Sequence, residues 1–232
     1  MTPPRLGARL STALDLIGGA SVLADIGCDH GQLACAFVSE DAARRCIAID
    51  ISAPSLDKAR VLALERGLSE QVETRLGSGF LPLAVGEADV CAVLGMGGTL
   101  MCELLDACGT DFRGAGRIVF QPMRAPEDIR LWLWEHDCRI LDDRMIEDGG
   151  RIYQIFSAAK PGSGRNNLPA GWPEGYFGAG SVAFERREPL MKRWIDERLE
   201  RDELRLLSAG ASSRAGKLRR DAAALRWMKE HF

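Results

Sequence analysis

The stretch that decides the fold is Leu23-Ala24-Asp25-Ile26-Gly27-Cys28-Asp29-His30-Gly31, and Asp50 follows it 19 residues after Gly31. An apolar run that ends in an acidic residue and a glycine turn is typical of a buried strand that leads into a ligand-binding loop. A second acidic residue about one βαβ unit later completes the layout of a nucleoside-cofactor site. The sequence therefore makes an enzyme the leading interpretation.

Short apolar runs rich in β-branched residues indicate strands, and helical patterns separate the first five of them. The runs are Val22–Ile26, Cys46–Asp50, Val72–Leu76, Val90–Leu94, Arg117–Gln121, Arg139–Met145 and Ile152–Ala158. Strands that alternate with helices indicate a parallel sheet that is covered on both faces. Only Glu147-Asp148-Gly149-Gly150 separates the last two runs, which predicts a hairpin. We therefore expect an α/β fold with a mostly parallel sheet and an antiparallel last strand.

The C-terminal part of the chain has a different pattern. Glycine, proline and asparagine dominate between about Pro161 and Gly180, which indicates a linker or an ordered loop. From about Val182 onward, two charged helical stretches flank Ser208–Ser213, and each carries one apolar stripe. We expect a catalytic domain over residues 1–160, a connection over 161–180 and an antiparallel helical hairpin over 181–232.

Composition and charge are those of an ordinary globular protein, with 46% hydrophobic residues and a net charge of −3 over 232 residues. The start of the chain lacks the apolar core and the cleavage site of a signal peptide, and no run of about 18 uncharged apolar residues occurs. We therefore expect a cytoplasmic protein without a membrane segment. The 7 cysteines form no Cys-x-x-Cys pair, which is typical of reduced, buried thiols, so no metal site is expected.

Charge separates the two ends of the chain. Residues 181–232 hold 13 Lys and Arg against 9 Asp and Glu, whereas the rest of the chain is acidic. A basic helical appendage on an acidic body is typical of an arm that binds a polyanion. The alternative is that these mixed charges form only a solvated helix face.

Asp29 indicates which kind of cofactor the first turn accepts. The motif is Asp-x-Gly-x-x-x-Gly, and Asp29 stands where a dinucleotide site needs a small residue beside the pyrophosphate. A carboxylate at that position repels phosphate, so a cofactor with an ammonium or sulfonium group is favoured. S-adenosylmethionine is such a molecule.

Two further segments are candidates for binding the nucleoside. Asp50 can accept hydrogen bonds from both ribose hydroxyls, or it can act only as a helix N-cap. Gly77-Ser78-Gly79 follows the third predicted strand and would bring backbone groups and a hydroxyl toward the adenine. Alone, this second segment is equally compatible with a simple turn.

The glycines after the fourth predicted strand are candidates for the target site. In Leu94-Gly95-Met96-Gly97-Gly98-Thr99 the backbone can approach a flat substrate, or it can form only a flexible turn before a helix near Thr99. The Gln121 amide follows the fifth strand and can line the same site. His30 can act as a base or merely bond to neighbouring backbone, and we interpret it as a turn residue.

Several of these segments resemble the bacterial TrmK-type tRNA (adenine-N1)-methyltransferases, which modify the adenine at position 22. The matching segments are Leu23–His30, Arg75–Gly79, Gly95–Thr99, Gln121-Pro122 and Glu147–Tyr153, and Tyr176-Phe177-Gly178 leads into a helical pair like that of the family. Two positions depart from the family pattern. Ser78 stands where an acid is expected, and Met123 stands where asparagine is common.

The resemblance implies a Rossmann-like class I methyltransferase that uses S-adenosylmethionine and holds tRNA with its helical hairpin. It implies cofactor contacts from Asp25, Gly27, Cys28, Asp29, His30, Asp50, Ile51, Gly77, Ser78, Gly79, Leu94 and Gly95. The target base would border Gly95, Met96, Gly97 and Gly98. Asp29 is also the candidate to stabilise, or to help deprotonate, the cationic base that methylation leaves.

Two other functions stay open from the sequence. One is a methyltransferase that acts on a protein or a small molecule and uses the hairpin for dimerisation. The other is a catalytically inactive module that keeps the cofactor pocket and binds a partner through the hairpin. The leading hypothesis is methylation of N1 of an adenine in tRNA, in which orientation of the two reactants is the enzyme's main contribution.

Overall fold

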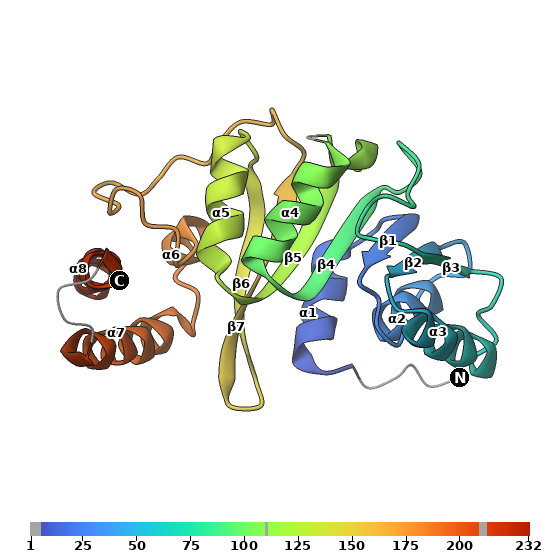
Figure 1. The fold of residues 1–232 in the computed structure, drawn as a ribbon, viewed down its shortest axis with the longest axis horizontal. Coiled ribbons are helices and arrows are strands. Elements are labelled where there is room, and N and C mark those ends of the chain that lie inside the picture. The colour runs from blue at the N-terminus through green and yellow to red at the C-terminus, as the bar shows by residue number, and fades with distance from the viewer. Residues whose placement is uncertain (1–5, 110, 209–212) are drawn as a thin grey trace.

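The computed structural model describes residues 6–109, 111–208 and 213–232, and it contains a seven-stranded sheet with helices on both faces (Figure 1). The strands are β1 (Val22–Ile26), β2 (Arg45–Asp50), β3 (Val72–Leu76), β4 (Val90–Gly97), β5 (Arg117–Arg124), β6 (Ile140–Asp148) and β7 (Arg151–Ala159). The helices are α1 (Ala8–Ile17), α2 (Gln32–Ser39), α3 (Ala53–Glu65), α4 (Gly98–Cys108), the 3₁₀ turn η1 (Phe112–Gly114), α5 (Pro126–Glu135), α6 (Ser181–Glu185), α7 (Met191–Ser208) and α8 (Ser213–His231).

The strand order is β3-β2-β1-β4-β5-β7-β6, which confirms the predicted α/β fold class. Strands β1 to β5 are parallel, and β7 runs antiparallel to both of its neighbours. The antiparallel last strand lies inside the sheet and not at its edge, because β7 pairs with β5 as well as with its hairpin partner β6. The direction of winding reverses between β1 and β4, and ligands bind at such switch points, outside the carboxyl ends of the strands.

Both faces of the central strands are buried. Along β4, Cys91 and Val93 face one hydrophobic cluster, whereas Val90 and Ala92 face the other. Helices α1, α2 and α3 cover the second face, and α4 and α5 cover the first. This burial explains why the parallel strands appear in the sequence as continuous apolar runs without alternation.

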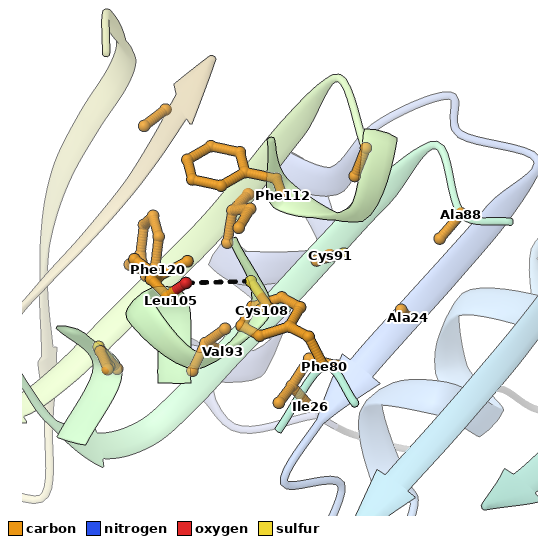
Figure 2. Close-up of a cluster of buried hydrophobic side chains, with 14 of the residues drawn as sticks. Ala24, Ile26, Phe80, Ala88, Cys91, Val93, Leu105, Cys108, Phe112 and Phe120 are labelled. Atoms are coloured by element: carbon orange, nitrogen blue, oxygen red, sulfur yellow. Dashed lines mark hydrogen bonds between the residues drawn. The ribbon is translucent and has the colours of Figure 1, made fainter. Parts of the chain in front are cut away.

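Figure 2 shows the cluster on the α4 side, where phenylalanine rings fill the space between sheet and helices. Phe80 reaches it from the segment after β3, Phe112 from η1 and Phe120 from β5. The Cys108 thiol at the end of α4 donates a hydrogen bond of 3.2 Å to the Leu105 carbonyl. All 7 cysteines are free thiols, and this one is buried among apolar side chains.

The C-terminal helices α7 and α8 lie beyond the β6 edge of the sheet (Figure 1). They run antiparallel, because Asp196 of α7 pairs with Lys229 of α8 and Glu203 pairs with Arg226. The expected first helical stretch from about Val182 is two helices, α6 and α7. Pro189 lies between them, and a proline lacks the N–H that a continuous helix requires. Of the predicted break at Ser208–Ser213, residues 209–212 lie outside the described part of the chain.

Residues 161–180 pack against these helices. Trp172 and Tyr176 are buried in a third hydrophobic cluster together with Trp194 of α7 and Leu225 of α8. Met145 of β6 belongs to the same cluster, so sheet, connecting segment and helical pair share one core. No helix in the described ranges is long and apolar enough to cross a membrane.

A buried polar network also ties the connecting segment to the sheet. The Arg130 guanidinium of α5 donates to both carboxylate oxygens of Asp143 in β6, at 2.8 and 3.0 Å, and to Gln154 Oε1 in β7 at 2.9 Å. The Gln154 amide in turn donates to the Gly178 carbonyl at 3.0 Å. Asp143 is fully buried, so its charge depends on Arg130 for compensation.

We predict that Asp143→Ala lowers the free energy of unfolding by about 3–5 kcal/mol, because it leaves the Arg130 charge buried and unpaired. Urea denaturation measures the change. The matched control is Asp57→Ala, which removes an exposed partner of Arg60 and should cost less than about 1 kcal/mol. Equal effects of the two substitutions would contradict this role of the buried pair.

Candidate functional site

The turn after β1 lies on the end of β2. The backbone amides of Gly27 and Cys28 both donate to the Ile49 carbonyl, at 2.8 and 3.0 Å. Gly27 has φ +75° and Gly31 has φ +72°, conformations that favour glycine. A Cβ on Gly31 would lie 2.8 Å from Cβ of Ala59 in α3, so this position also needs glycine for close packing.

Asp50 connects that turn to the start of α3. Its Oδ2 accepts from the Asp29 amide at 3.1 Å, and its Oδ1 accepts from the Ser52 amide at 2.8 Å. The N-cap of α3 is Ser52, whose hydroxyl accepts from the Ser55 amide, so Asp50 is not the capping residue. Each carboxylate oxygen of Asp50 keeps further acceptor capacity, which two ribose hydroxyls can use.

Asp25 is a buried carboxyl group with an unused oxygen. Its side chain lies near the end of β1, the residue is 4% exposed, and Oδ2 has no hydrogen-bond partner among the described residues. Burial, followed by the nearby Asp50 carboxylate, raises the pKa of Asp25 to about 7. An ammonium group would supply the missing partner and favour the ionised form, so the residues present fit the expected cofactor.

Asp29 and His30 form the exposed rim of the turn. Asp29 has φ +48°, a left-handed conformation that is uncommon for residues other than glycine but that aspartate adopts more readily than most. His30 Nε2 lies 3.0 Å from Nζ of Lys58 on α3 and 3.3 Å from Asp29 Oδ1. His30 therefore links the turn to α3, in agreement with its interpretation as a turn residue.

Two exposed apolar side chains lie close to the ends of β2 and β3. Ile51, after β2, is 74% exposed, and Leu76, at the end of β3, is 61% exposed. Asp50 of β2 and Leu76 of β3 lie opposite each other in the sheet, and the Gly77 amide donates to the Asp50 carbonyl at 3.0 Å. Ser78 follows, exposed, at the same edge. Sequence reasoning did not select Leu76, although an apolar residue at the end of a strand beside an acidic motif was a usable signal.

The segment Leu94–Thr99 is not the loop that the sequence predicts. Strand β4 continues to Gly97 with a bulge around Met96, and α4 begins at Gly98. Gly95 has φ +76°, and its amide donates to Gln121 Oε1 at 3.2 Å. Gln121 is buried and thus fixes the Gly95 backbone through Oε1, and its expected place along the site stays a prediction.

The first turn and the end of β4 meet. A Cβ on Gly27 would lie 2.1 Å from Cε of Met96, so the methionine side chain covers the glycine. Cys28 is buried beside them, and burial raises the pKa of its thiol well above its usual value, which leaves it protonated and not nucleophilic. The candidate cofactor residues and the candidate target segment are therefore neighbours at one edge of the sheet.

Sequence reasoning missed a cluster beside this edge. Arg9 of α1 donates from Nε to Asp148 Oδ2 at 3.0 Å and lies over the Tyr153 ring, 5.0 Å from its centroid. It also contacts the Met123 sulfur at 3.4 Å. These residues are up to 144 positions apart in the chain, so no local pattern could reveal the cluster. Among the described residues no group of three or more His, Cys, Asp or Glu side chains is placed to hold a metal ion.

Comparison with known proteins yields three kinds of likeness. The model of a family described as a methyltransferase domain matches residues 6–156. The tRNA (adenine(22)-N(1))-methyltransferase of Bacillus subtilis is 30% identical over 204 residues, which cover 85% of this chain and 83% of that protein. Among solved structures, a Streptococcus pneumoniae putative tRNA (m1A22) methyltransferase in complex with S-adenosyl-L-methionine has a TM-score of 0.80 at 22% identity, with 97% of this chain and 99% of that chain covered. The M. capricolum TrmK structure with S-adenosyl-homocysteine has a TM-score of 0.82 at 19% identity, with 98% of this chain and 99% of that chain covered.

We predict that Gly98→Ala destabilises the fold by about 1–3 kcal/mol, because its Cβ would lie 2.0 Å from the Ala125 carbonyl oxygen, which is backbone and cannot rotate away. Gly97→Ala is the matched control, since no atom lies within 4 Å of its Cβ. It should cost less than about 1 kcal/mol, as expected for an N-cap glycine. Urea denaturation compares the two, and a control as unstable as Gly98→Ala would refute the packing explanation.

We also predict a pH dependence of S-adenosylmethionine binding. Below pH 7 the raised pKa of Asp25 leaves the carboxyl group protonated, and a cationic ligand favours the ionised form. Affinity should therefore rise about tenfold from pH 5.5 to pH 7 when measured by calorimetry. Asp25→Asn should bind more weakly and show little change over that range, and a pH-independent wild-type affinity would exclude this role.

Proposed function

The chain belongs to the tRNA (adenine(22)-N1)-methyltransferase family, and we propose that it transfers a methyl group from S-adenosylmethionine to N1 of the adenine at position 22 of tRNA. One observation carries the proposal: Oδ2 of the buried Asp25 carboxyl group has no hydrogen-bond partner among the described residues, and it lies at the end of β1 near the Asp50 carboxylate. Such an arrangement favours a ligand that combines a cationic group with ribose hydroxyls.

The cofactor residues have separate roles in this proposal. Asp25 holds the ammonium group and Asp50 accepts from the ribose hydroxyls, while Ile51 and Leu76 contact the adenine ring and Ser78 lies at its edge. Bound S-adenosylmethionine supplies a methyl group that its sulfonium makes electrophilic, so the protein needs no nucleophile. This agrees with the protonated, buried Cys28 and with the interpretation of His30 as a turn residue.

The target adenine borders the segment Gly95–Gly98 in this proposal. Adenine N1 faces its pairing partner inside a helix, so the base must be unpaired or extruded before it can react. Gln121 holds the Gly95 backbone, and the Met96 side chain covers Gly27. These contacts fix the position of the target segment relative to the cofactor-binding turn. Orientation of two bound reactants is then the main source of rate enhancement. Asp29 is the carboxylate available to stabilise the cationic product base.

Binding of tRNA is assigned to residues 181–232 and cofactor binding to residues 1–160. The net positive charge of the C-terminal part suits the RNA backbone, which repels the acidic remainder of the chain. Because its substrate is tRNA, we place the enzyme in the cytoplasm.

The test is incubation with labelled S-adenosylmethionine and a tRNA transcript, followed by digestion and nucleoside mass spectrometry. We expect 1-methyladenosine in a transcript with adenine at position 22 and none when guanine replaces that adenine. Label at another nucleotide would refute the assigned position. Cofactor binding without transfer to any tRNA would instead support an inactive module.

A further inference from the structure

A cavity of about 630 Å³ lies between the sheet and α7. One wall is formed by Pro122–Glu127, which runs from the end of β5 into α5, together with Gly150–Gln154 from the β6–β7 turn and β7. The other wall is formed by side chains of α7 between Trp194 and Arg205. We call this cavity the α7 cleft. Its α7 wall belongs to residues 181–232, which we propose bind tRNA, but no role is assigned above to the cleft itself.

The α7 cleft is strongly basic. Its arginines come from both walls: Arg124 and Arg151 from the sheet side, and Arg198, Arg201 and Arg205 from α7. Its two carboxylates each pair with one cation outside the cleft: Glu127 Oε1 lies 3.5 Å from Lys217 Nζ, and Glu197 Oε1 lies 3.3 Å from Arg193 Nε. The buried Glu127 Oε2 has no hydrogen-bond partner among the described residues, but five arginines outnumber these two carboxylates. Positive charge therefore exceeds negative charge inside the cleft.

Three of the cleft arginines have no anionic partner among the described residues. Arg124, Arg151 and Arg201 are exposed, and none of them forms an ion pair with another residue of the described chain. A guanidinium presents a rigid fork of N–H donors that fits a phosphate group in a bidentate manner. Unpaired guanidiniums on two facing walls favour a ligand with several phosphates.

Asp202 holds the remaining two arginines. It lies on α7 and is 0% exposed, and its Oδ2 accepts from Arg198 Nε at 3.0 Å. Its Oδ1 lies 3.5 Å from an Nη of Arg205. A buried carboxylate that contacts two guanidiniums limits their conformations, so less entropy is lost when those guanidiniums bind an anion.

The α7 cleft adjoins the proposed target site. Pro122 and Met123 line it, and they directly follow Gln121, which holds the Gly95 backbone. Tyr153, the ring under Arg9, also lines the cleft. A polynucleotide whose base lies against Gly95–Gly98 therefore has its neighbouring backbone within reach of the cleft arginines.

We propose that the α7 cleft binds the phosphate backbone of the RNA next to the target nucleotide, and that Asp202 is the positioning residue for Arg198 and Arg205. The inference rests on the proposed function, since it takes RNA as the substrate. It goes beyond that function because it places the RNA backbone between α7 and the end of the sheet. The cofactor-binding domain then contacts the RNA as well. The basic C-terminal part then contributes one face of a clamp.

The first test compares charge reversals inside and outside the α7 cleft. Arg201→Glu and Arg124→Glu, one on each wall, should each raise KM for tRNA at least tenfold and leave kcat and the Kd for S-adenosylmethionine unchanged. Arg139→Glu makes the same charge change at an exposed position that neither lines the cleft nor belongs to residues 181–232. It should change KM less than about threefold.

Salt dependence gives a second measurement on the same variants. Loss of one phosphate contact should reduce the slope of log affinity for tRNA against log salt concentration by about 0.7–0.9 for each cleft variant. The Arg139→Glu slope should stay near that of the wild type. Equal KM and slope changes for Arg201→Glu and Arg139→Glu would overturn the cleft in favour of a general charge effect, and so would an unchanged Arg201→Glu enzyme.

A double-mutant cycle tests the positioning role of Asp202. Asp202→Asn should raise KM for tRNA without lowering kcat, and Arg205→Gln, which leaves the buried carboxylate in place, should do the same. If Asp202 acts through Arg205, the double variant should be clearly less impaired than the product of the single effects. Asp202 is only structural if the two single effects on KM multiply in the double variant. The same holds if kcat falls in parallel with the thermal stability of the variants.

These outcomes are separable from a failure of the proposed function. If the wild-type protein methylates no RNA, the function itself is wrong. If the wild type methylates tRNA and the cleft variants keep its KM, the function stands and only the cleft assignment is wrong.

Discussion

Asp25, Asp29 and Asp50 meet at one edge of the sheet, and the negative charge that they share is the constraint on which the rest of the site depends. Asp50 is held by two backbone amides, so its position is determined by the turn after β1 and the start of α3. Asp25 has no partner for one oxygen and is buried, which raises its pKa. A phosphate would be repelled from this edge, whereas a cationic nucleoside relieves the repulsion.

The remaining elements keep that edge in a defined geometry. Positive φ values at Gly27 and Gly31 allow the turn to lie on β2 and α3, and Met96 brings the end of β4 over Gly27. On the other side, the core shared by the sheet, residues 161–180 and the C-terminal helices holds α7 in place. The buried pair of Arg130 and Asp143 supports the same junction. The α7 cleft can therefore serve as a preformed binding surface.

Much of this architecture is predictable from the sequence, because parallel strands buried on both faces appear as uninterrupted apolar runs. The predicted bounds of β1 and β3 agree with the structure. The acidic residues of the first turn were found because their spacing follows the βαβ unit. Features that depend on distant partners were not predictable. The extension of β4 requires pairing with β5, and the Arg9 cluster joins α1 to the β6–β7 hairpin.

The central claim is that Asp25 stays available for a cation until the cofactor binds. A carbon-13 NMR titration of the Asp25 carboxyl group tests it most directly, with the Asp25→Asn variant used to assign the signal. The account predicts a midpoint near pH 7 in the free protein, in keeping with the raised pKa of about 7. With saturating S-adenosylmethionine the group should stay ionised down to at least pH 6. A midpoint below pH 5 in the free protein, or a midpoint that the cofactor does not change, would contradict the account.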